Sequence, residues 1–503
     1  MMDLNLFAAL ISATLALVFF FRKRPATPPG PLGLPLIGNV FDLPKRESWK
    51  VYLQWSKEYN SDIICLNMMG NRLFILNSVT VVQDLLSKRS SIYSDRPRST
   101  LLDLIGTSWI IPFMDNTYEW KEHRRLFRRE FDTADQSATN KSHEVKAARR
   151  LLPRLLACKE HDEELRLGAV DAILSITYGI TPTNFDHPFI RTPEGINAIF
   201  ADVAKGGYLV DVFPSLKALP RWLPGVQFHK VADKGKPLAR ALVMDPYLEV
   251  QRQMADGTAV PSVASKFLSV AQGNSSISES EVEAMRNVCG NAYLGGADTT
   301  VCALQNFVLA MALHQDVQKK VQKGLDEVLG GTRLPDFGDF DSVPYLLAVI
   351  NEVFRWHPVT PFAIYHVANS DDVYNGYEIP KGSMMVPNVY AIMHDEQLFG
   401  PDPDKFIPER FMKEGGPQFS DVELAFGFGR RVCPGKLMAR DTLWIMAATI
   451  LTTYDITEAT DMNGQKLTSD SYLEYTNAMV SFAPRVKVSF KLRVPESMIQ
   501  ESD

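Results

Sequence analysis

The chain has 503 residues, of which 46% are apolar and 22% charged, a composition typical of a folded protein with a large core and not of a disordered chain. Its formal net charge of -6 argues against a nucleic-acid-binding protein, which normally carries a basic excess. The five cysteines are odd in number and never spaced as CxxC, which excludes a disulfide framework or a structural zinc site and favours a reducing compartment.

The N-terminus carries an uncharged apolar stretch, residues 4–21, followed directly by the basic residues 22–24. A helix of this length spans about 27 Å, close to the ~30 Å thickness of the hydrocarbon core of a bilayer. In a secretory signal peptide the positive charge precedes the apolar run, whereas here it follows. The sequence therefore predicts an uncleaved membrane anchor over residues 1–21, with the rest of the chain on the cytoplasmic side.

Residues 22–45 contain the basic flank and six prolines, five of them within residues 25–35, which favour a stiff, extended linker; a plain linker without special geometry is the alternative. From residue 46 to residue 503 there is no internal repeat and no second linker, so we expect one large domain. Short strand-like runs occur near its start and around residues 374–386, and most of the remainder has helical periodicity. The fold class is predicted to be mainly α with small β-sheets.

The first helix of chemical interest begins at Ser278, with Glu281 in a capping box, and extends to about His314. Its middle reads LGGADTT, residues 294–300, and two glycines there weaken the helix by about 1 kcal/mol each. Close packing against another helix is one explanation. The other is a local bulge that makes room for a ligand and turns Asp298 and Thr299 towards it, where an acid beside an alcohol can pass protons.

The second helix is predicted from Ser342, as its cap, through Pro344 to Trp356, where Pro358 prevents continuation. Glu352 and Arg355 lie three residues apart on one face of it. Such pairs are usually solvated surface bridges. The apolar neighbours of this pair favour burial, with further hydrogen bonds to satisfy the two charges.

The third helix follows the stretch FGFGRRVCPG, residues 426–435, and is expected to begin at Pro434 or Gly435. Cys433 then lies beside the helix N-terminus, where the dipole favours a thiolate. A nucleophilic cysteine needs a base, and no histidine follows His394 in the chain. A thiolate that is the only protein ligand suits an iron whose equatorial positions a porphyrin fills, with Arg431 meeting an anionic edge of that group.

These residues carry a family resemblance. The stretch resembles the haem-binding signature FxxGxRxCxG of the cytochrome P-450 monooxygenases, with Phe426, Gly429, Arg431, Cys433 and Gly435 in place. Three further motifs are similar to those of the family and occur in its order: GGADTT, EVFR and PERF. The resemblance extends from the anchor through essentially the whole chain, in the style of microsomal, fungal members.

The resemblance implies a cytochrome P-450 fold, a single large haem-binding domain behind the N-terminal transmembrane helix, in the endoplasmic reticulum membrane with the domain in the cytosol. It also implies haem b (heme, iron protoporphyrin) with an axial thiolate. The residues implied to hold this cofactor are Cys433 as the iron ligand, Phe426 shielding the sulfur, Gly429 and Gly435 of the loop, Gly295 and Gly296 as an oxygen groove, and Trp120, Arg124, Arg431 and His366 at the propionates. For His366 the alternative is a histidine that stabilises a turn.

By the same resemblance, Asp298 and Thr299 are the implied catalytic residues that deliver protons. A structural triad of Glu352, Arg355 and Arg410 is implied to lock the fold around the haem. Electrons are expected from NADPH through a flavin reductase, which would dock on the basic run at residues 124–129 with Lys436; a solvated helix face is the alternative for this run.

The function implied is insertion of one oxygen atom from O2 into a hydrophobic small molecule, such as a terpenoid, steroid or polyketide, in secondary metabolism or xenobiotic oxidation. The segments that match the family's substrate-contact regions are mainly apolar: residues 101–111, 359–364 and 477–482. Two alternatives remain open at this point. One is a membrane-anchored cysteine hydrolase that uses Cys433, and the other is a non-enzymatic haem sensor or carrier.

Overall fold

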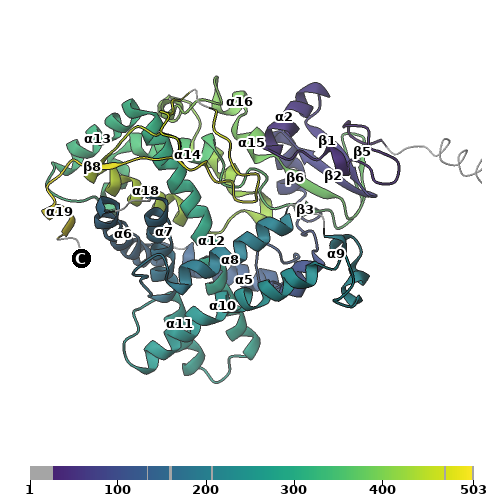
Figure 1. Ribbon diagram of the computed structural model, residues 1–503, viewed down its shortest axis with the longest axis horizontal. Coiled ribbons are helices and arrows are strands. Elements are labelled where there is room, and N and C mark those ends of the chain that lie inside the picture. Colours follow the sequence, from purple (N-terminus) through teal and green to yellow (C-terminus); the bar gives the residue numbers. More distant parts are fainter. Residues whose placement is uncertain (1–25, 133, 158–160, 205–207, 470–471, 501–503) are drawn as a thin grey trace, which may run out of the picture.

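The computed structural model describes residues 26–132, 134–157, 161–204, 208–469 and 472–500. The predicted anchor over residues 1–21 lies outside these residues. The described chain is mainly helical, with a small sheet at one edge, as Figure 1 shows, and this confirms the predicted fold class.

The α-helices surround one long central helix, α12. Their bounds are α2 Ser48–Glu58, α3 Val79–Val82, α4 Thr100–Ile105, α5 Tyr118–Phe131, α6 Ala134–Ala157, α7 His161–Tyr178, α8 Pro188–Ala204, α9 Leu209–Val212, α10 Phe228–Ala255, α11 Val263–Gly273, α12 Glu279–Leu313, α13 Gln315–Leu329, α14 Pro344–Trp356, α15 Val389–Met393, α16 Glu396–Phe399, α17 Phe419–Val422, α18 Lys436–Thr453 and α19 Ser497–Gln500. Short 3-10 or π-helical turns connect many of them, including η2 Gln83–Lys88, η5 Pro408–Met412, η6 Glu423–Phe426 and η7 Gly429–Arg431.

The main sheet has four strands in the order β1-β2-β6-β3. Strands β1 (Ile63–Met68) and β2 (Asn71–Leu76) form an antiparallel hairpin, β6 (Met384–Pro387) is parallel to β2, and β3 (His366–Val367) is antiparallel to β6. Two further pairs are β4 (Asp372–Tyr374) with β5 (Tyr377–Ile379), and β7 (Tyr454–Ile456) with β8 (Phe490–Leu492). The sheet thus joins the start of the chain to the segment that follows α14.

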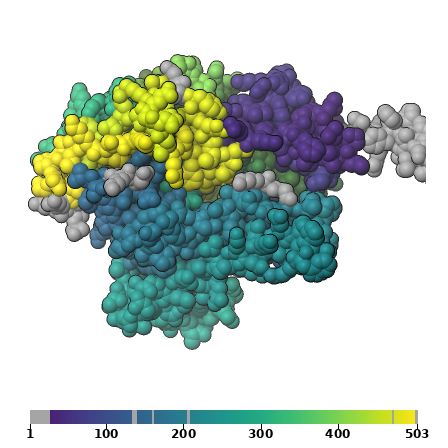
Figure 2. Space-filling model, in the orientation of Figure 1, coloured from purple at the N-terminus to yellow at the C-terminus, as the bar shows by residue number. Residues whose placement is uncertain are grey.

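The described part of the predicted linker is attached to this sheet. The backbone N–H of Cys65 donates to the carbonyl oxygen of Pro29 at 3.0 Å, and that of Glu378 donates to Ala26 at 2.9 Å. Gly38 bridges to Met68. In Figure 2 this purple N-terminal part forms one end of the body, beside the yellow C-terminal chain. Residues 26–45 are therefore fixed to the domain along their length.

Helix α12 starts as predicted. The Ser278 hydroxyl accepts from the Glu281 N–H at 3.3 Å, and the Glu281 carboxylate accepts from the Ser278 N–H at 2.9 Å. One hydrophobic cluster packs around its first half, with α5, α8, α10 and α11, and another around its second half, with α6, α14 and α18. Within the described residues it is the one helix long and apolar enough to cross a membrane, and 78% of that apolar stretch is buried inside the fold, which identifies it as a core helix.

Two local expectations were wrong. Helix α12 stays α-helical through residues 294–300, so its glycines do not produce the expected bulge. Helix α14 is capped at Val343 without a side-chain hydrogen bond, so Ser342 is not its cap, although Pro344 does occupy its first turn. At that position the missing proline N–H removes one of the groups that a cap would otherwise satisfy.

Candidate active site

The loop that carries Cys433 joins η6 to α18. Its turn is closed by the Cys433 N–H, which donates to the Phe426 carbonyl oxygen at 2.7 Å. Gly427 and Gly429 have φ angles of 94° and 54°, which favour glycine. A Cβ atom on Gly429 would also lie 2.1 Å from the Leu86 carbonyl oxygen in η2. Gly429 is thus required for contact with another backbone, and its implied role at the cofactor stays a prediction.

The Cys433 thiol lies just before α18, whose cap is Gly435. Cys433 is surrounded by protein, yet part of its surface remains exposed. This combination is expected for a side chain that faces an internal space. Burial raises the pKa of Cys433, while the Gly435 amide and the Arg124 charge act in the opposite direction. Burial thus opposes the effect of the helix start, and the thiolate form of Cys433 stays a prediction.

Three arginines gather around this loop, two of them buried and Arg124 half-buried. Arg431 donates from Nε to the Ser94 carbonyl oxygen at 2.7 Å and from Nη2 to Met114 at 2.8 Å. Arg124, on α5, donates to the carbonyl oxygen of Val432, the residue before the cysteine. The third is Arg96, whose guanidinium donates to the carbonyl oxygens of Pro112, Ile364 and Tyr365 at 2.9, 2.5 and 2.7 Å.

The three guanidinium groups lack an anionic partner among the described residues. Burial, then the Arg124 charge, lowers the pKa of Arg431 to about 10, and burial with the charges of Arg431 and Arg124 lowers the pKa of Arg96 strongly. Of the acids that act on this cluster, Asp115 is paired with Arg98 at 3.0 Å and Asp132 with Arg128 at 3.4 Å, whereas the charge of Asp95 raises the pKa of Arg431 without forming an ion pair with a described residue. Such a cluster is stable only when a bound anion offsets the repulsion.

Two donors in the same cluster have no partner in the described part of the chain. They are Nη1 of Arg431 and the indole Nε1 of Trp120. The Arg431 guanidinium also lies over the Trp120 ring, 4.1 Å from its centroid. Because buried donors are almost always hydrogen bonded, these two indicate acceptors supplied by a ligand.

The two central glycines of α12 have different surroundings. A Cβ atom on Gly295 would meet nothing within 4 Å, and this residue is exposed although its helix is mostly buried. A Cβ atom on Gly296 would lie 2.7 Å from Cγ1 of Ile173 on α7. Close helix packing, one of the two explanations considered for the pair, therefore accounts for Gly296. Gly295 borders open space, and Thr299, one turn later, donates from its hydroxyl to the Gly295 carbonyl oxygen at 2.5 Å.

We expected Asp298 to turn towards that open space, but its side chain is held elsewhere. Its side chain is buried, forms an ion pair with Arg166 on α7, and accepts a hydrogen bond from Asn197 on α8 at 2.7 Å. The structure thus separates Asp298 from Thr299, which are adjacent in sequence but lie on different sides of the helix.

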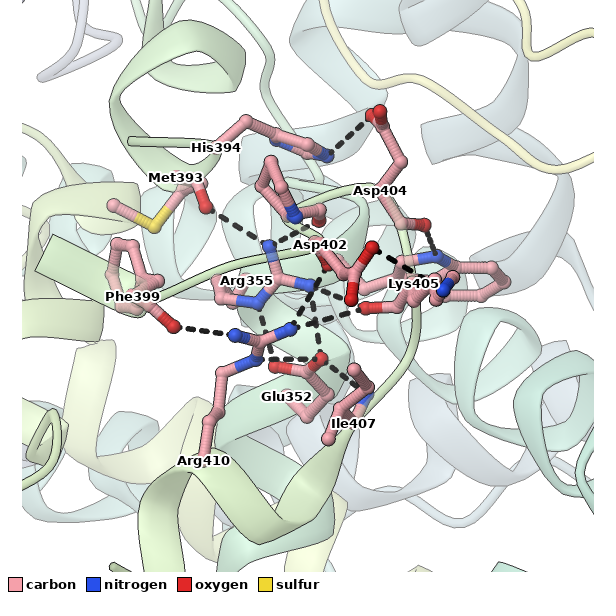
Figure 3. A network of polar contacts seen from close by, with 12 residues as sticks. Glu352, Arg355, Met393, His394, Phe399, Asp402, Asp404, Lys405, Ile407 and Arg410 are labelled. Atoms are coloured by element: carbon pink, nitrogen blue, oxygen red, sulfur yellow. Dashed lines mark hydrogen bonds and ion pairs between the residues drawn. The ribbon is translucent and has the colours of Figure 1, made fainter. Parts of the chain in front are cut away.

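Glu352 and Arg355 form a fully buried pair, as predicted, and Arg410 joins them (Figure 3). Arg355 donates to both Glu352 carboxylate oxygens, at 2.6 and 2.9 Å, and Arg410 donates to one of them at 3.2 Å. The Ile407 N–H donates to the same oxygen at 2.6 Å. The remaining guanidinium N–H groups reach backbone carbonyls, of Met393, Pro403 and Lys405 for Arg355 and of Phe399 and Asp402 among others for Arg410.

Two of the three apolar segments expected near a substrate are hydrogen bonded to α12, and the remaining one is hydrogen bonded to the third segment. Asn291 holds the first, because its amide donates to the Trp109 carbonyl oxygen at 3.0 Å and accepts from the Ile111 N–H at 2.8 Å. The Cys302 thiol donates to the Ser481 carbonyl oxygen of the third at 3.2 Å. Ser481 in turn donates from its N–H to Val359 of the second at 2.9 Å.

Comparison with known proteins agrees with this arrangement. The family described as Cytochrome P450 matches residues 28–479. The chain is 46% identical to a cytochrome P450 monooxygenase, eriA, of Hericium erinaceus over 98% of this chain and 93% of that protein. It is 39% identical to the cytochrome P450 monooxygenase ple1 of Rhodocybe pseudopiperita (92% and 88% covered) and 37% identical to a tryptamine 4-monooxygenase of Psilocybe cyanescens (88% and 89% covered).

The chain belongs to the cytochrome P450 family. It is accordingly an oxidoreductase that incorporates oxygen, and the family implies haem with thiolate ligation, a reductase as redox partner and a small-molecule substrate. Neither a cysteine hydrolase nor a non-enzymatic haem carrier is consistent with this membership.

The residues of this cytochrome P450 fit a haem. Cys433 offers a half-buried thiol, and the unpartnered donors of Arg431 and Trp120 suit propionate carboxylates. Arg124 and Arg96 add the positive charge that two propionates would offset. Arg96 was missed in the sequence, because it lies in no recognised motif.

His366 fits the propionates less well. Its Nδ1 lies 2.6 Å from the Tyr93 carbonyl oxygen, which can only accept, so the ring proton lies on Nδ1. Burial and the Arg96 charge lower the pKa of His366 far below its usual range. A neutral ring in this tautomer presents Nε2 as an acceptor. The structure therefore supports the alternative, a histidine that holds a backbone turn, and leaves its predicted propionate contact without a donor.

Replacing Glu352 by glutamine tests the buried triad. The change leaves two buried guanidinium groups without a counter-charge, so we expect the free energy of unfolding to fall by about 3 to 5 kcal/mol in urea denaturation. Glu327→Gln is the matched control, because it breaks an exposed pair with Lys323 at 3.9 Å on α13 and should cost less than about 1 kcal/mol. Equal losses in the two variants would contradict the assigned burial.

Replacing Arg96 by methionine tests the haem cradle. Loss of a charge-assisted hydrogen bond worth about 1.5 to 3 kcal/mol should weaken haem binding roughly tenfold or more. The measurement is the ratio of haem to protein absorbance after purification, with far-ultraviolet circular dichroism as the test of folding. Arg98→Met, two residues away on the surface, should retain the wild-type ratio. Full haem occupancy in the folded Arg96→Met protein would exclude Arg96 from the cradle.

Proposed function

We propose that the protein is a membrane-bound monooxygenase that inserts one oxygen atom of O2 into a hydrophobic small molecule, in secondary metabolism or xenobiotic oxidation. The observation that carries the proposal is the presence of the half-buried Cys433 thiol and its arginine cluster together with a core helix whose largely buried middle is exposed at Gly295. Haem bound there would supply oxygen activation. The chain would supply the thiolate, the propionate contacts, the apolar walls and the protons.

The proposed residue roles follow from these surroundings. Cys433 would ligate the iron, with Phe426 beside it, since the Phe426 carbonyl oxygen anchors the cysteine loop. Thr299 lies at the open part of α12 and would donate or relay a proton there, while Asp298, the residue before it, would supply that proton. Gly295 would leave room for oxygen.

A hydrophobic substrate is supported by the walls near α12. Trp109 packs against Gly290 of α12, with its Cζ3 atom 3.1 Å from the position of an added Cβ, and Phe113 stacks edge-on with Phe200 of α8 at 5.5 Å between centroids. One relative is named for tryptamine, an aromatic amine. The walls described here favour an uncharged terpenoid, steroid or polyketide skeleton over an anion, because they are apolar and the nearby Arg166 is already paired with Asp298.

Electrons are proposed to come from NADPH through a flavin reductase that docks beside α5. The side chains of Arg125, Arg128 and Arg129 are 64%, 66% and 49% exposed, and all three point outwards from the helix that holds Arg124 inside. Each is paired with a neighbouring acid, so the patch is less basic than the sequence alone indicates. Lys436 is paired with Glu423 at 2.7 Å. An acidic partner would have to compete for these pairs, and binding should weaken with salt.

The proposed membrane anchor, residues 1–21, is supported by the surface near the point where the described chain begins. Leu32 and Leu36 are each 96% exposed there. Leu209, Phe213 and Trp222, in and after α9, are 56%, 54% and 80% exposed, and α9 lies at the same end of the molecule in Figure 1. Large exposed apolar groups on one side suit contact with a bilayer. We place the domain, residues 46–503, in the cytosol at the endoplasmic reticulum, behind the linker at residues 22–45.

The proposal is tested by turnover. The full-length protein with NADPH and a fungal reductase in vesicles should convert at least one compound of a lipophilic panel to a product with one added oxygen, labelled when the gas is oxygen-18. Conversion should cease without the reductase and in a Cys433→Ala variant. Products that carry label from water in place of O2, or that gain no oxygen, would contradict a monooxygenase.

A further inference from the structure

An open cavity of about 860 Å³ lies beside α2, between that helix, α15, the end of α14 and the C-terminal chain. Lys50, Leu53, Gln54 and Lys57 line it from α2, and their spacing of three and four residues places them on one face of the helix. Among the described residues that line the cavity, none belongs to the cysteine loop or to its arginine cluster. The cavity is therefore separate from the candidate active site.

The buried wall of the cavity holds a tyrosine without a hydrogen-bond partner. Tyr475 is only 6% exposed, and its Oη has no partner among the described residues. Its ring is stacked on His357 at 3.3 Å between centroids, and His357 lies 6.0 Å from Trp49 in the first turn of α2. Burial raises the pKa of Tyr475, so its hydroxyl stays protonated and able to donate. Because buried donors are almost always hydrogen bonded, this one indicates an acceptor that a ligand supplies.

One of the three lysines of the cavity is free of ion pairs. Lys50 is paired with Glu47 at 2.8 Å, and Lys405 is paired with Asp402 at 3.2 Å. Lys57, in the last turn of α2, is exposed and forms no ion pair with a described residue. Its ammonium group can therefore meet a negative charge without breaking an existing pair.

The other titratable groups of the cavity add little charge. Burial lowers the pKa of His357 and of His394 far below the usual range, and it also lowers the pKa of His314, so the three rings are neutral. Asp404, drawn in Figure 3, has a side chain that is 84% exposed, so water screens its charge. One unpaired lysine therefore matches a ligand with a single negative charge.

Aromatic rings form much of the remaining wall. Tyr390 is stacked on His394 with 3.8 Å between centroids and 22° between planes. His314 is stacked on Phe406 with 5.1 Å and 24°. Flat, stacked rings favour a planar, aromatic ligand body.

The cavity is connected to the substrate side of the protein through His357. The Nε2 atom of His357 lies 3.1 Å from the Ser481 hydroxyl, in the third apolar segment. The carbonyl oxygen of Ser481 accepts from the Cys302 thiol of α12 at 3.2 Å. A ligand that contacts the stacked rings of Tyr475 and His357 would therefore stabilise one position of this segment.

We propose that this cavity is an effector site for a planar aromatic carboxylate that carries a second oxygen at its far end. Trp49, beside the rings of His357 and Tyr475, and Lys57 are eight residues apart in α2, about 12 Å along its axis. The carboxylate would lie at Lys57, and the second oxygen would accept from Tyr475 Oη. The site goes beyond the proposed function, and its tests do not use turnover.

Binding is tested by calorimetry with 6-hydroxy-2-naphthoate on the full-length, haem-loaded protein. Saturating clotrimazole, an azole that binds haem iron, keeps the probe out of the haem pocket. Tyr475→Phe should weaken binding of this probe about tenfold but leave that of 2-naphthoate, which lacks the second oxygen, unchanged. Lys57→Gln should weaken both about threefold, and Lys323→Gln on α13, whose side chain is 79% exposed, should weaken neither. Absence of binding, or equal binding by the wild type and Tyr475→Phe, would overturn the site.

Thermal unfolding without the probe tests the unpartnered hydroxyl by itself. Tyr475→Phe keeps the stack on His357 and removes a buried donor that has no partner, so the Tm should not fall. A lower Tm would show that the hydroxyl is already bonded within the protein, and would overturn the proposal.

The effector role is tested by the affinity for clotrimazole, read from the shift of the Soret band. Saturating 6-hydroxy-2-naphthoate should change the Kd of the azole by about threefold or more in the wild type, and the change should disappear in Tyr475→Phe. Direct competition at the haem would persist in that variant, and would contradict the role. An unchanged Kd in the wild type would also contradict it.

Discussion

The position of the cysteine loop depends on the buried carboxylate of Glu352. This one group accepts hydrogen bonds from Arg355, Arg410 and the Ile407 backbone, and so ties α14 to η5 and to the chain that precedes it. The network holds two cations and one anion away from water, which is tolerable only because the other guanidinium N–H groups all find backbone carbonyls. Phe354, beside Arg355 on α14, packs edge-on against Phe426 at 5.1 Å between centroids. A shift of α14 would therefore be transmitted directly to the loop of Cys433.

The second constraint is electrostatic. Arg96, Arg124 and Arg431 lie together and repel one another, and two of the acids that act on the cluster, Asp115 and Asp132, are paired with other arginines. Backbone carbonyls satisfy part of their hydrogen bonding but none of their charge. A ligand that binds a thiolate and carries two carboxylates would supply the missing negative charge and the missing hydrogen-bond acceptors. Cofactor binding and folding stability are therefore expected to be linked in this protein.

Much of the candidate site could be predicted from local sequence. The loop of Cys433, the buried pair of Glu352 and Arg355, and the cap of α12 each occupy a few adjacent residues with strong side-chain preferences, and the structure confirms the pair and the cap. What escaped prediction depends on contacts between distant parts of the chain. The orientation of Asp298 is decided by Arg166, and the need for glycine at position 429 by the backbone of Leu86. Arg96 was missed because its role depends on three backbone carbonyls and on two other arginines. Of these partners only Pro112 is at all near it in the sequence.

The central claim is that Cys433 ligates a haem iron through its sulfur. The most direct measurement is the absorption spectrum of the reduced full-length protein with carbon monoxide. If Cys433 is the ligand, we expect the red-shifted Soret band of thiolate-ligated haem for the wild-type protein and its loss in Cys433→Ala. A wild-type protein that purifies without haem when haem is supplied, or a Cys433→Ala variant that keeps the red-shifted band, would contradict it.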